Sequence, residues 1–330
     1  MRLAALSYRR RARQGVVIDG AVRSDAVIDI IPPRALDRPR YVTGYRIPGV
    51  TFTANVGSRF QIMDPDDPMR YQAALRVVVR AALPFDLAIR GSTTINLYND
   101  FDDIDRDSDS VLPKVRSDIA RYLREGETGI ESLYLEWRSS VLRDVHVRGY
   151  AGVLEEMYSG VGGEILYQPF ASRTAYGFTV NYLRQRDFDK DFGLRDYETV
   201  TGFASFYWAT PFSNYDFAIH AGRYLAKDVG ATVEIRRTFR NGWSIGGWAT
   251  LTDVPFDEFG EGSFDKGLFF RVPLNSLLPG NTRGSYATAI RPTQRDGGQR
   301  TEGFGSTIWW ESRYVRADSL AETRSRMIPR

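Results

Sequence analysis

The stretch from Asp253 to Gly267 holds the densest set of carboxylates that could act on a ligand. Its acidic residues are Asp253, Asp257, Glu258, Glu261 and Asp265. Grouped carboxylates can bind a cation, accept hydrogen bonds from sugar hydroxyls, or supply the acid and base of a glycosidase. A glycosidase also needs a defined separation between two carboxylates, which a sequence does not fix. The alternative is a structural loop, in which glycines permit tight turns and apolar side chains pack the loop down.

A second cluster, from Arg291 to Arg300, is rich in arginine and glutamine. We take Arg295, Asp296 and Arg300 as its candidates for ligand contact, because guanidinium groups make forked hydrogen bonds to carboxylates, phosphates and sugar hydroxyls. Paired with the acidic stretch, the same residues would instead form a salt-bridge network that holds the interior of the protein in shape. The sequence leaves both interpretations open.

Metal-binding and catalytic motifs are not recognisable. An EF-hand loop beginning at Asp103 would need Gly and Glu at the positions where Ser108 and Lys114 stand. His146 and His220 are far apart in the sequence and have no third partner at metal or triad spacing. We therefore expect no metal, no cofactor and no catalytic residue.

The polar side chains are positioned by strands with two different faces. In residues 229–240, apolar Val233 and Ile235 alternate with Glu234 and Arg236. A period of two over this length indicates a β-strand with one apolar and one polar face. If the sheet closes, Glu234 and Arg236 face its interior and join the candidates for ligand contact.

The same alternation recurs over most of the chain and predicts about 14 strands. An Asn-Gly pair at 241–242 marks a hairpin, so neighbouring strands should be antiparallel. The predicted strands lie at 50–62, 70–82, 86–98, 130–139, 143–155, 161–169, 174–187, 198–210, 214–225, 229–240, 243–252, 265–273, 284–292 and 303–311. Apolar residues at helical spacing between Pro113 and Gly126 predict a short amphipathic helix at 111–126. A second short helix is expected in the tail.

Composition excludes several classes of protein. No run of about 18 apolar residues exists, so a transmembrane helix is not expected. The absence of cysteine rules out disulfides and thiolate metal sites. The formal net charge of +3 comes from 44 basic and 41 acidic residues dispersed along the chain, which gives no case for a nucleic-acid partner.

Strand length favours a membrane barrel over other ways of closing a large sheet. Strands of soluble sandwiches usually have about five or six residues, whereas about 9 to 11 tilted residues cross a bilayer, as the longer predicted strands would. No repeat of propeller length is present. We predict an all-β, antiparallel outer-membrane-type barrel over residues 46–312, after an irregular segment (1–45) and before a helical tail (313–330). A soluble β-sandwich is the alternative.

Several long segments between residues 40 and 310 are similar to sequences of a known protein family. They include VLPKVRSDIARYLREG at 111–126, YAGVLEEMYSGVGGEILYQPF at 150–170, TGFASFYWATPFSNYDFAIHAGRYLAKDVGAT at 201–232 and TDVPFDEFGEGSFDKGLFFRVPL at 252–274. These segments resemble the YjbH family of exopolysaccharide-locus proteins, in particular a carboxy-terminal portion of its members. The resemblance implies an outer-membrane β-barrel, in a family often described as lipoproteins, with a role in exopolysaccharide or capsule export or surface assembly.

The partners implied are outer-membrane lipid, the exopolysaccharide, and periplasmic or outer-membrane proteins of the same secretion locus. We expect a non-catalytic role in which a polar lumen contacts the polymer. The candidate contact residues are Asp253, Asp257, Glu261, Asp265, Arg295, Asp296, Arg300, Glu234 and Arg236. The alternative function is a surface β-protein that binds carbohydrate or modifies it in the manner of a glycosidase.

The amino terminus does not read as a signal peptide. Arg9, Arg10 and Arg11 follow a short apolar stretch, whereas a signal peptide places its positive residues before an apolar run of at least about seven. We therefore expect a chain truncated at its amino terminus, with its export signal upstream and its location in the outer membrane of a Gram-negative cell. The chain has no cysteine, the residue to which a lipid anchor is attached.

Overall fold

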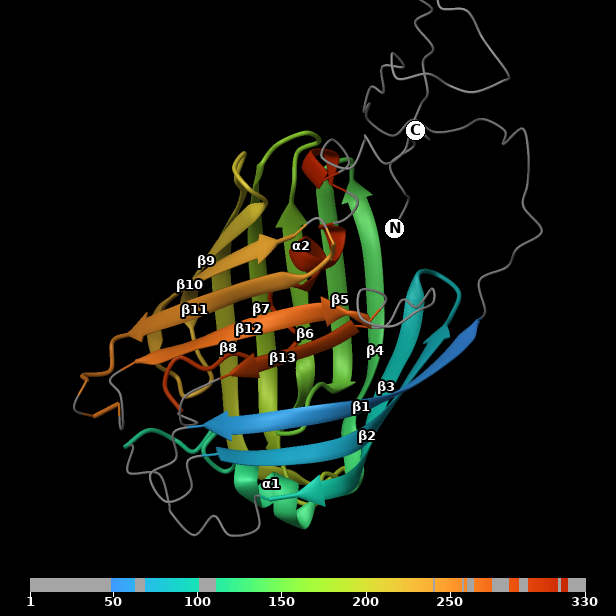
Figure 1. Cartoon of the computed structure of the whole chain (residues 1–330), viewed down its shortest axis with the longest axis vertical. Coiled ribbons are helices and arrows are strands. Elements are labelled where there is room, and N and C mark those ends of the chain that lie inside the picture. The colour runs from blue at the N-terminus through green and yellow to red at the C-terminus, as the bar shows by residue number, and fades with distance from the viewer. Residues whose placement is uncertain are drawn as a thin grey trace, which may run out of the picture.

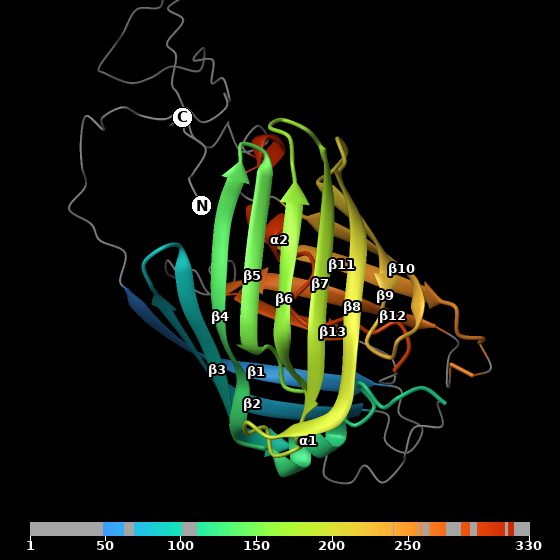
Figure 2. The same cartoon turned by 180° about the vertical axis from the view of Figure 1, so that it is seen from behind.

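The chain folds into one antiparallel sheet that curls into a nearly closed barrel (Figure 1), and the view from behind shows the same wall of strands (Figure 2). The computed structural model describes residues 49–62, 69–100, 111–239, 241–256, 258–259, 264–274, 285–290, 296–313 and 316–319. The predicted all-β antiparallel barrel is therefore confirmed. The segment 1–45, expected to be irregular, lies outside the described residues.

Thirteen strands follow one another in chain order within the described residues, and each pairs with the next. Their bounds are β1 Val50–Ile62, β2 Met69–Ala82, β3 Leu87–Asn99, β4 Gly129–Leu142, β5 Val145–Val153, β6 Tyr158–Tyr167, β7 Thr174–Arg186, β8 Leu194–Ala209, β9 Tyr215–Arg223, β10 Val229–Thr238, β11 Ser244–Thr252, β12 Asp265–Pro273 and β13 Ser285–Ile290. Two short helices, α1 (Ile119–Glu125) and α2 (Thr307–Ser312), accompany them.

Alternation along each strand sorts side chains between two surfaces. On β7, Phe178 and Val180 are exposed on the outside, while Thr179 and Asn181 are buried in the interior. Asn181 donates a hydrogen bond to the hydroxyl of Thr201, the residue opposite it on β8 (3.2 Å). The polar face of the sheet is therefore the inner face of the barrel.

The β10–β11 hairpin confirms the predicted Asn-Gly turn. Thr238 pairs with Ser244, and Gly242 has a φ of +89°, a conformation that costs a residue with a Cβ atom more than it costs glycine. The turn therefore sets the register in which Glu234 and Arg236 point inward.

One predicted strand is wrong. Residues 303–306 form a loop, and α2 begins at Thr307, so no strand occupies 303–311. The short apolar run containing Trp309 fits a strand or a buried helix equally well by periodicity. The burial of Trp309 against the inner wall of the barrel selects the helix. The described residues contain thirteen strands, where the sequence predicts about fourteen.

The helices are shorter than expected. Within the predicted helix 111–126, α1 begins only at Ile119, although Gly126 caps it as expected. Of the tail 313–330, residues 317–319 are helical, and 314–315 and 320–330 lie outside the described residues. No helix in the part of the chain that the structure describes is long and apolar enough to cross a membrane.

Two apolar clusters lie inside the barrel, beside its polar face. One joins α1 residues such as Tyr122 and Leu123 to Leu154, Tyr158 and Phe304. The other surrounds Trp309 of α2, near the opposite end (Figure 1). Both clusters contain residues that follow β13, so the end of the chain forms part of the interior.

Candidate functional site in the barrel interior

The segment after β13 returns into the barrel, and we call residues 296–313 the lumen segment. Figure 1 shows its helix, α2, surrounded by the strands. The ring of Trp309 is fully buried and stacks on Tyr207 of β8, with 5.0 Å between ring centroids and 20° between planes. Thr179 of β7 donates to the carbonyl oxygen of Gly305 (3.1 Å). The polar inner wall therefore binds the chain's own carboxy-terminal residues.

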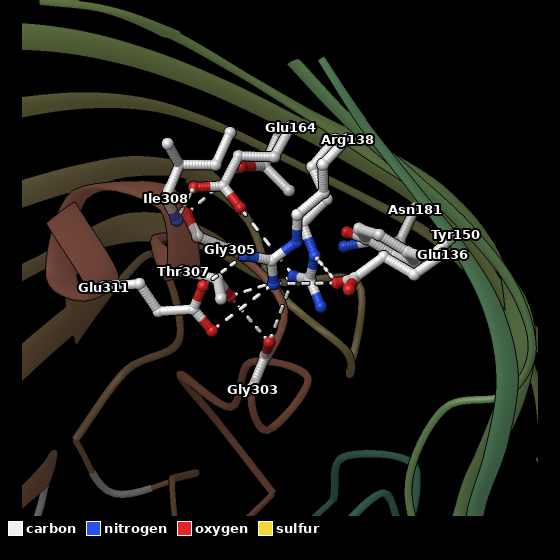
Figure 3. A network of polar contacts seen from close by, with 12 residues as sticks. Glu136, Arg138, Tyr150, Glu164, Asn181, Gly303, Gly305, Thr307, Ile308 and Glu311 are labelled. Carbon is white, nitrogen blue, oxygen red and sulfur yellow. Dashed lines mark hydrogen bonds and ion pairs between the residues drawn. The ribbon is translucent and has the colours of Figure 1, made fainter. Parts of the chain in front are cut away.

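A network of arginines and glutamates holds the lumen segment to β4, β5 and β6 (Figure 3). At its centre, the buried carboxylate of Glu136 accepts contacts from Arg90 (2.7 Å), Arg138 (2.8 Å) and Arg148 (2.5 Å). Arg138 also forms an ion pair with Glu311 of α2. Because a buried charge is costly unless it is paired and hydrogen-bonded, this clustering fixes the positions of its members.

Arg148 carries this network directly onto the lumen segment. Its guanidinium donates to the hydroxyl of Thr307 (2.9 Å) and to the carbonyl oxygen of Gly303 (3.3 Å). Glu164 lies 3.8 Å from the same guanidinium and accepts a hydrogen bond from the backbone N–H of Ile308 (3.0 Å). The first turn of α2 is thus tied to the wall by one arginine and one glutamate.

Asp296 anchors the start of the lumen segment to the chain that precedes α1. Its carboxylate accepts hydrogen bonds from the backbone N–H groups of Val115 (2.8 Å), Arg116 (2.7 Å) and Ser117 (3.0 Å), and from the hydroxyl of Ser117 (2.8 Å). Burial raises the pKa of Asp296, and these donors act in the opposite direction. All four contacts are internal, so this predicted ligand residue has a structural task.

Arg116 and Glu155 form a second anchor nearby. They make a two-pronged ion pair, with distances of 2.7 and 3.0 Å, and the backbone N–H of Glu302 donates to the same carboxylate (2.6 Å). Burial raises the pKa of Glu155, while the positive charge of Arg116 lowers it. The sequence offered no signal for this pair, because the partners are distant in the chain and belong to no motif.

The hydroxyl of Tyr122 on α1 is buried at this end of the barrel, and its ionisation can be used to test the packing there. Its hydroxyl donates to the carbonyl oxygen of Arg186, and burial raises its pKa to about 12. The folded state therefore favours the neutral phenol. The resulting contribution to stability is fully present below the unfolded pKa of about 10, and it is lost as the pH rises through the folded pKa of about 12.

We expect Tyr122→Phe to lower the free energy of unfolding by about 1 kcal/mol at pH 8, because the hydrogen bond is lost. The deficit should shrink or reverse by pH 11, since only the wild type then carries the ionisation penalty. Denaturant unfolding of both proteins at the two pH values measures this. A deficit that is the same at pH 8 and pH 11 would contradict the assignment.

Four of the residues selected from the sequence meet at one cavity, which we call the lumen cavity. Glu234, Arg236, Asp265 and Arg300 line its volume of about 850 Å³, between the lumen segment and the strands. Arg236 lies 3.2 Å from Glu234 and Arg300 lies 3.9 Å from it. Both arginines pair with Glu234 of β10, whereas the network predicted from the sequence joined the 291–300 cluster to the acidic stretch 253–267. Gln299 and Asp265 join those two clusters through a hydrogen bond.

Aromatic rings complete the lumen cavity. The guanidinium of Arg236 lies 3.8 Å from the ring centroid of Trp310 and 4.7 Å from that of Phe269. Asp265 accepts hydrogen bonds from Trp248 (2.7 Å) and Gln299 (3.0 Å). Rings beside hydrogen-bonding side chains can stack on sugar rings and bind their hydroxyls, so the chemistry of this surface suits carbohydrate contact.

The remaining candidates lie elsewhere. Asp253 is exposed and accepts a hydrogen bond from the backbone N–H of Val229 (2.8 Å), which closes the end of a hairpin. Asp257, Glu261 and Arg295 lie outside the described residues. Within the described ranges, no group of three or more acidic or histidine side chains could hold a metal ion.

Comparison with known proteins identifies the family to which the chain is similar. The sequence profile of the YjbH family, described as exopolysaccharide biosynthesis protein YbjH, matches residues 34–305. A protein of Escherichia coli strain K12, named uncharacterized lipoprotein YjbH, is 35% identical over 244 residues, which make up 72% of this chain and 35% of that protein. The match therefore spans about a third of that relative's length. The extent of both matches confirms the resemblance found in the sequence, and the chain belongs to the YjbH family of exopolysaccharide biosynthesis proteins.

Proposed function

We propose that this protein is an outer-membrane β-barrel that takes part in the export or surface assembly of an exopolysaccharide, without catalysing a reaction. The observation that carries the proposal is the orientation of the alternating strands. On β7, Tyr176, Phe178, Val180 and Tyr182 are exposed, while the residues between them point inward. Outer-membrane barrels place apolar side chains outward and polar ones inward, whereas a soluble protein buries its apolar face.

Strand length and the family support the membrane location. β7 has 13 residues and β8 has 16, more than the roughly 9 to 11 needed for a tilted strand to cross a bilayer. The E. coli relative is named a lipoprotein, which suits a protein associated with a membrane. Neither point depends on the interior of the barrel.

The lumen cavity is the surface that we assign to polymer contact. Its rings and guanidinium groups offer several weak contacts, and weak contacts allow a polymer to slide. Glu234 is paired with arginines, and Asp265 accepts hydrogen bonds from Trp248 and Gln299. These fixed partners favour a positioning role for both carboxylates over proton transfer to a substrate.

The lumen segment limits how far a polymer can enter. Because residues 296–313 pack inside the barrel, a polymer that enters would lie beside them, in spaces such as the lumen cavity. Passage along the whole barrel axis would require the lumen segment to move. The role in assembly and the role in export therefore differ in whether that movement occurs.

Fractionation of cells that make the protein tests the membrane location. We expect the protein in the outer-membrane fraction, with gel mobility that changes when the sample is boiled, because folded barrels of this type resist detergent until heated. Recovery in the soluble fraction without detergent would favour a soluble β-protein and contradict the proposal.

Two substitutions in the lumen cavity test polymer contact. Arg236→Ala and Trp310→Ala should each lower the amount of surface polymer several-fold in cells lacking the native gene, because each removes a contact worth about 1 kcal/mol. Arg121→Ala, on the exposed face of α1, is the matched control. Unchanged polymer after deletion of the gene would contradict the export role. Loss of polymer cleavage in Asp257→Asn or Glu261→Gln would instead establish the glycosidase alternative.

A further inference from the structure

A groove of about 730 Å³ runs over the outward face of β10, β11 and β12, which lie side by side in the wall (Figure 1). Ile235 of β10, Gly247 of β11 and Leu268 of β12 form one row across these strands. Ile235 and Leu268 are exposed on the outside, and Gly247 between them has no side chain. The hollow in the wall is therefore a product of the strand register.

The groove continues along β11 between apolar walls. In the row beyond Gly247, Ala249 of β11 lies between Val233 of β10 and Lys266 of β12, and all three line the groove. A strand rises about 3.3 Å per residue, so the distance from Arg237 to Val233 along β10 is about 13 Å. A narrow apolar channel of this length suits a hydrocarbon chain.

Arg237 supplies a positive charge at one end of the groove. Its guanidinium lies 4.6 Å from the ring centroid of Phe239 and 5.4 Å from that of Tyr215, and both rings line the same groove. Among the residues that the structure describes, no carboxylate forms an ion pair with Arg237. Two rings thus position a guanidinium whose N–H groups can make forked hydrogen bonds to a phosphate.

The end of the barrel at which Arg237 lies indicates which lipid it would meet in an outer membrane. Residues 239–243 join β10 to β11 at this end, whereas the two longest connections between strands, residues 100–128 and 253–264, lie at the opposite end. Outer-membrane barrels have short turns on the periplasmic side and longer loops outside the cell. Arg237 would therefore face the periplasmic leaflet, which consists of phospholipids and not of lipopolysaccharide.

We propose that this groove binds one phospholipid, with its phosphate on Arg237 and one acyl chain over Gly247 and Ala249. The inference rests on the proposed membrane location and goes beyond it, because it assigns a specific lipid to one place on the wall. The apolar walls match the hydrocarbon, and the unpaired positive charge matches the phosphate. A second copy of this chain would cover the apolar walls but would leave the phosphate position unexplained.

Native mass spectrometry of the full chain, exchanged into detergent that contains phosphatidylglycerol, measures the bound lipid. We expect one phosphatidylglycerol to be retained per chain in the wild type. Arg237→Ala should lower the retained fraction roughly tenfold, because a charge-assisted hydrogen bond is lost. Gly247→Leu should also lower it, since leucine fills the hollow between Ile235 and Leu268.

Two matched controls change the same residue types on the outward wall away from the groove. Arg223→Ala removes an outward arginine at the opposite end of β9, and Gly163→Leu fills an outward glycine of β6. Both should retain the lipid as the wild type does. Equal retention in all five proteins would overturn the proposal, and so would a wild type that retains no phosphatidylglycerol or that forms a lipid-free dimer which Gly247→Leu dissociates.

Fractionation and heat-dependent gel mobility of the same five proteins distinguish failure of the lipid site from failure of the proposed function. If all five are folded outer-membrane proteins and retention is equal, the lipid site is wrong and the membrane location stands. If the wild type is recovered in the soluble fraction without detergent, both proposals are wrong.

Discussion

Replacing Arg148 with methionine is expected to lower the free energy of unfolding by about 3–5 kcal/mol, the usual cost of removing one partner from a buried ion pair. The side chain of Arg148 is 1% exposed and contacts Glu136, Glu164 and Thr307. Glu136 keeps Arg90 and Arg138 in the variant. Glu164 loses the guanidinium 3.8 Å away and stays buried, so most of the cost arises there.

A second substitution distinguishes the charge effect from lost packing. Adding Glu164→Gln to Arg148→Met should recover part of the stability, because the uncompensated charge is removed. Arg121→Met is the control, since Arg121 forms an exposed i,i+4 pair with Glu125 and a cation–π contact with Phe188, and its loss should cost about 1 kcal/mol. Urea unfolding of the folded barrel measures all three proteins. Equal losses for Arg148→Met and Arg121→Met would contradict the role of the network.

Local sequence pattern predicts most of the wall of the barrel and little of what fills it. The inward position of Glu234 and Arg236 follows from alternation with Val233 and Ile235, which depends only on neighbours in the chain. The contact between Arg148 and Thr307 joins residues 159 positions apart. No periodicity reports a pairing over such a distance, so the network at Glu136 could not be found from the sequence.

In the candidate site, too, the sequence predicts some of the contacts and not others. Glu234, Arg236, Asp265 and Arg300 share a cavity because strand alternation and the return of the chain bring them together. Asp296 was selected for the same chemistry, yet its carboxylate accepts three backbone hydrogen bonds from residues 115–117. A polar side chain that satisfies buried amides resembles a ligand-binding one in sequence, because both tasks need an acceptor oxygen.

Replacing Asp216 with alanine is expected to release the carboxy-terminal end of the lumen segment from the barrel wall. Asp216 of β9 is buried and forms ion pairs with Arg313 (2.7 Å) and Arg316 (2.5 Å). Without it, two buried arginines share Asp318 at 3.8 and 3.4 Å. We expect a loss of about 3 kcal/mol, concentrated in this local contact.

Limited digestion with trypsin measures the release, because Arg313 and Arg316 are themselves cleavage sites that burial protects. If cleavage follows the open population, a loss of about 3 kcal/mol makes cleavage at these sites roughly 100-fold faster in Asp216→Ala. Asp196→Ala is the control, since Asp196 is fully exposed and lies 4.0 Å from Arg184. Unchanged protection would mean that Trp309 and the Arg148 contacts hold the lumen segment without Asp216. If release does occur, cells carrying Asp216→Ala report whether the lumen segment restricts the polymer. Surface polymer should rise when a barrier is removed, and it should fall when the polymer depends on the lumen cavity, which Trp310 of the lumen segment helps to line.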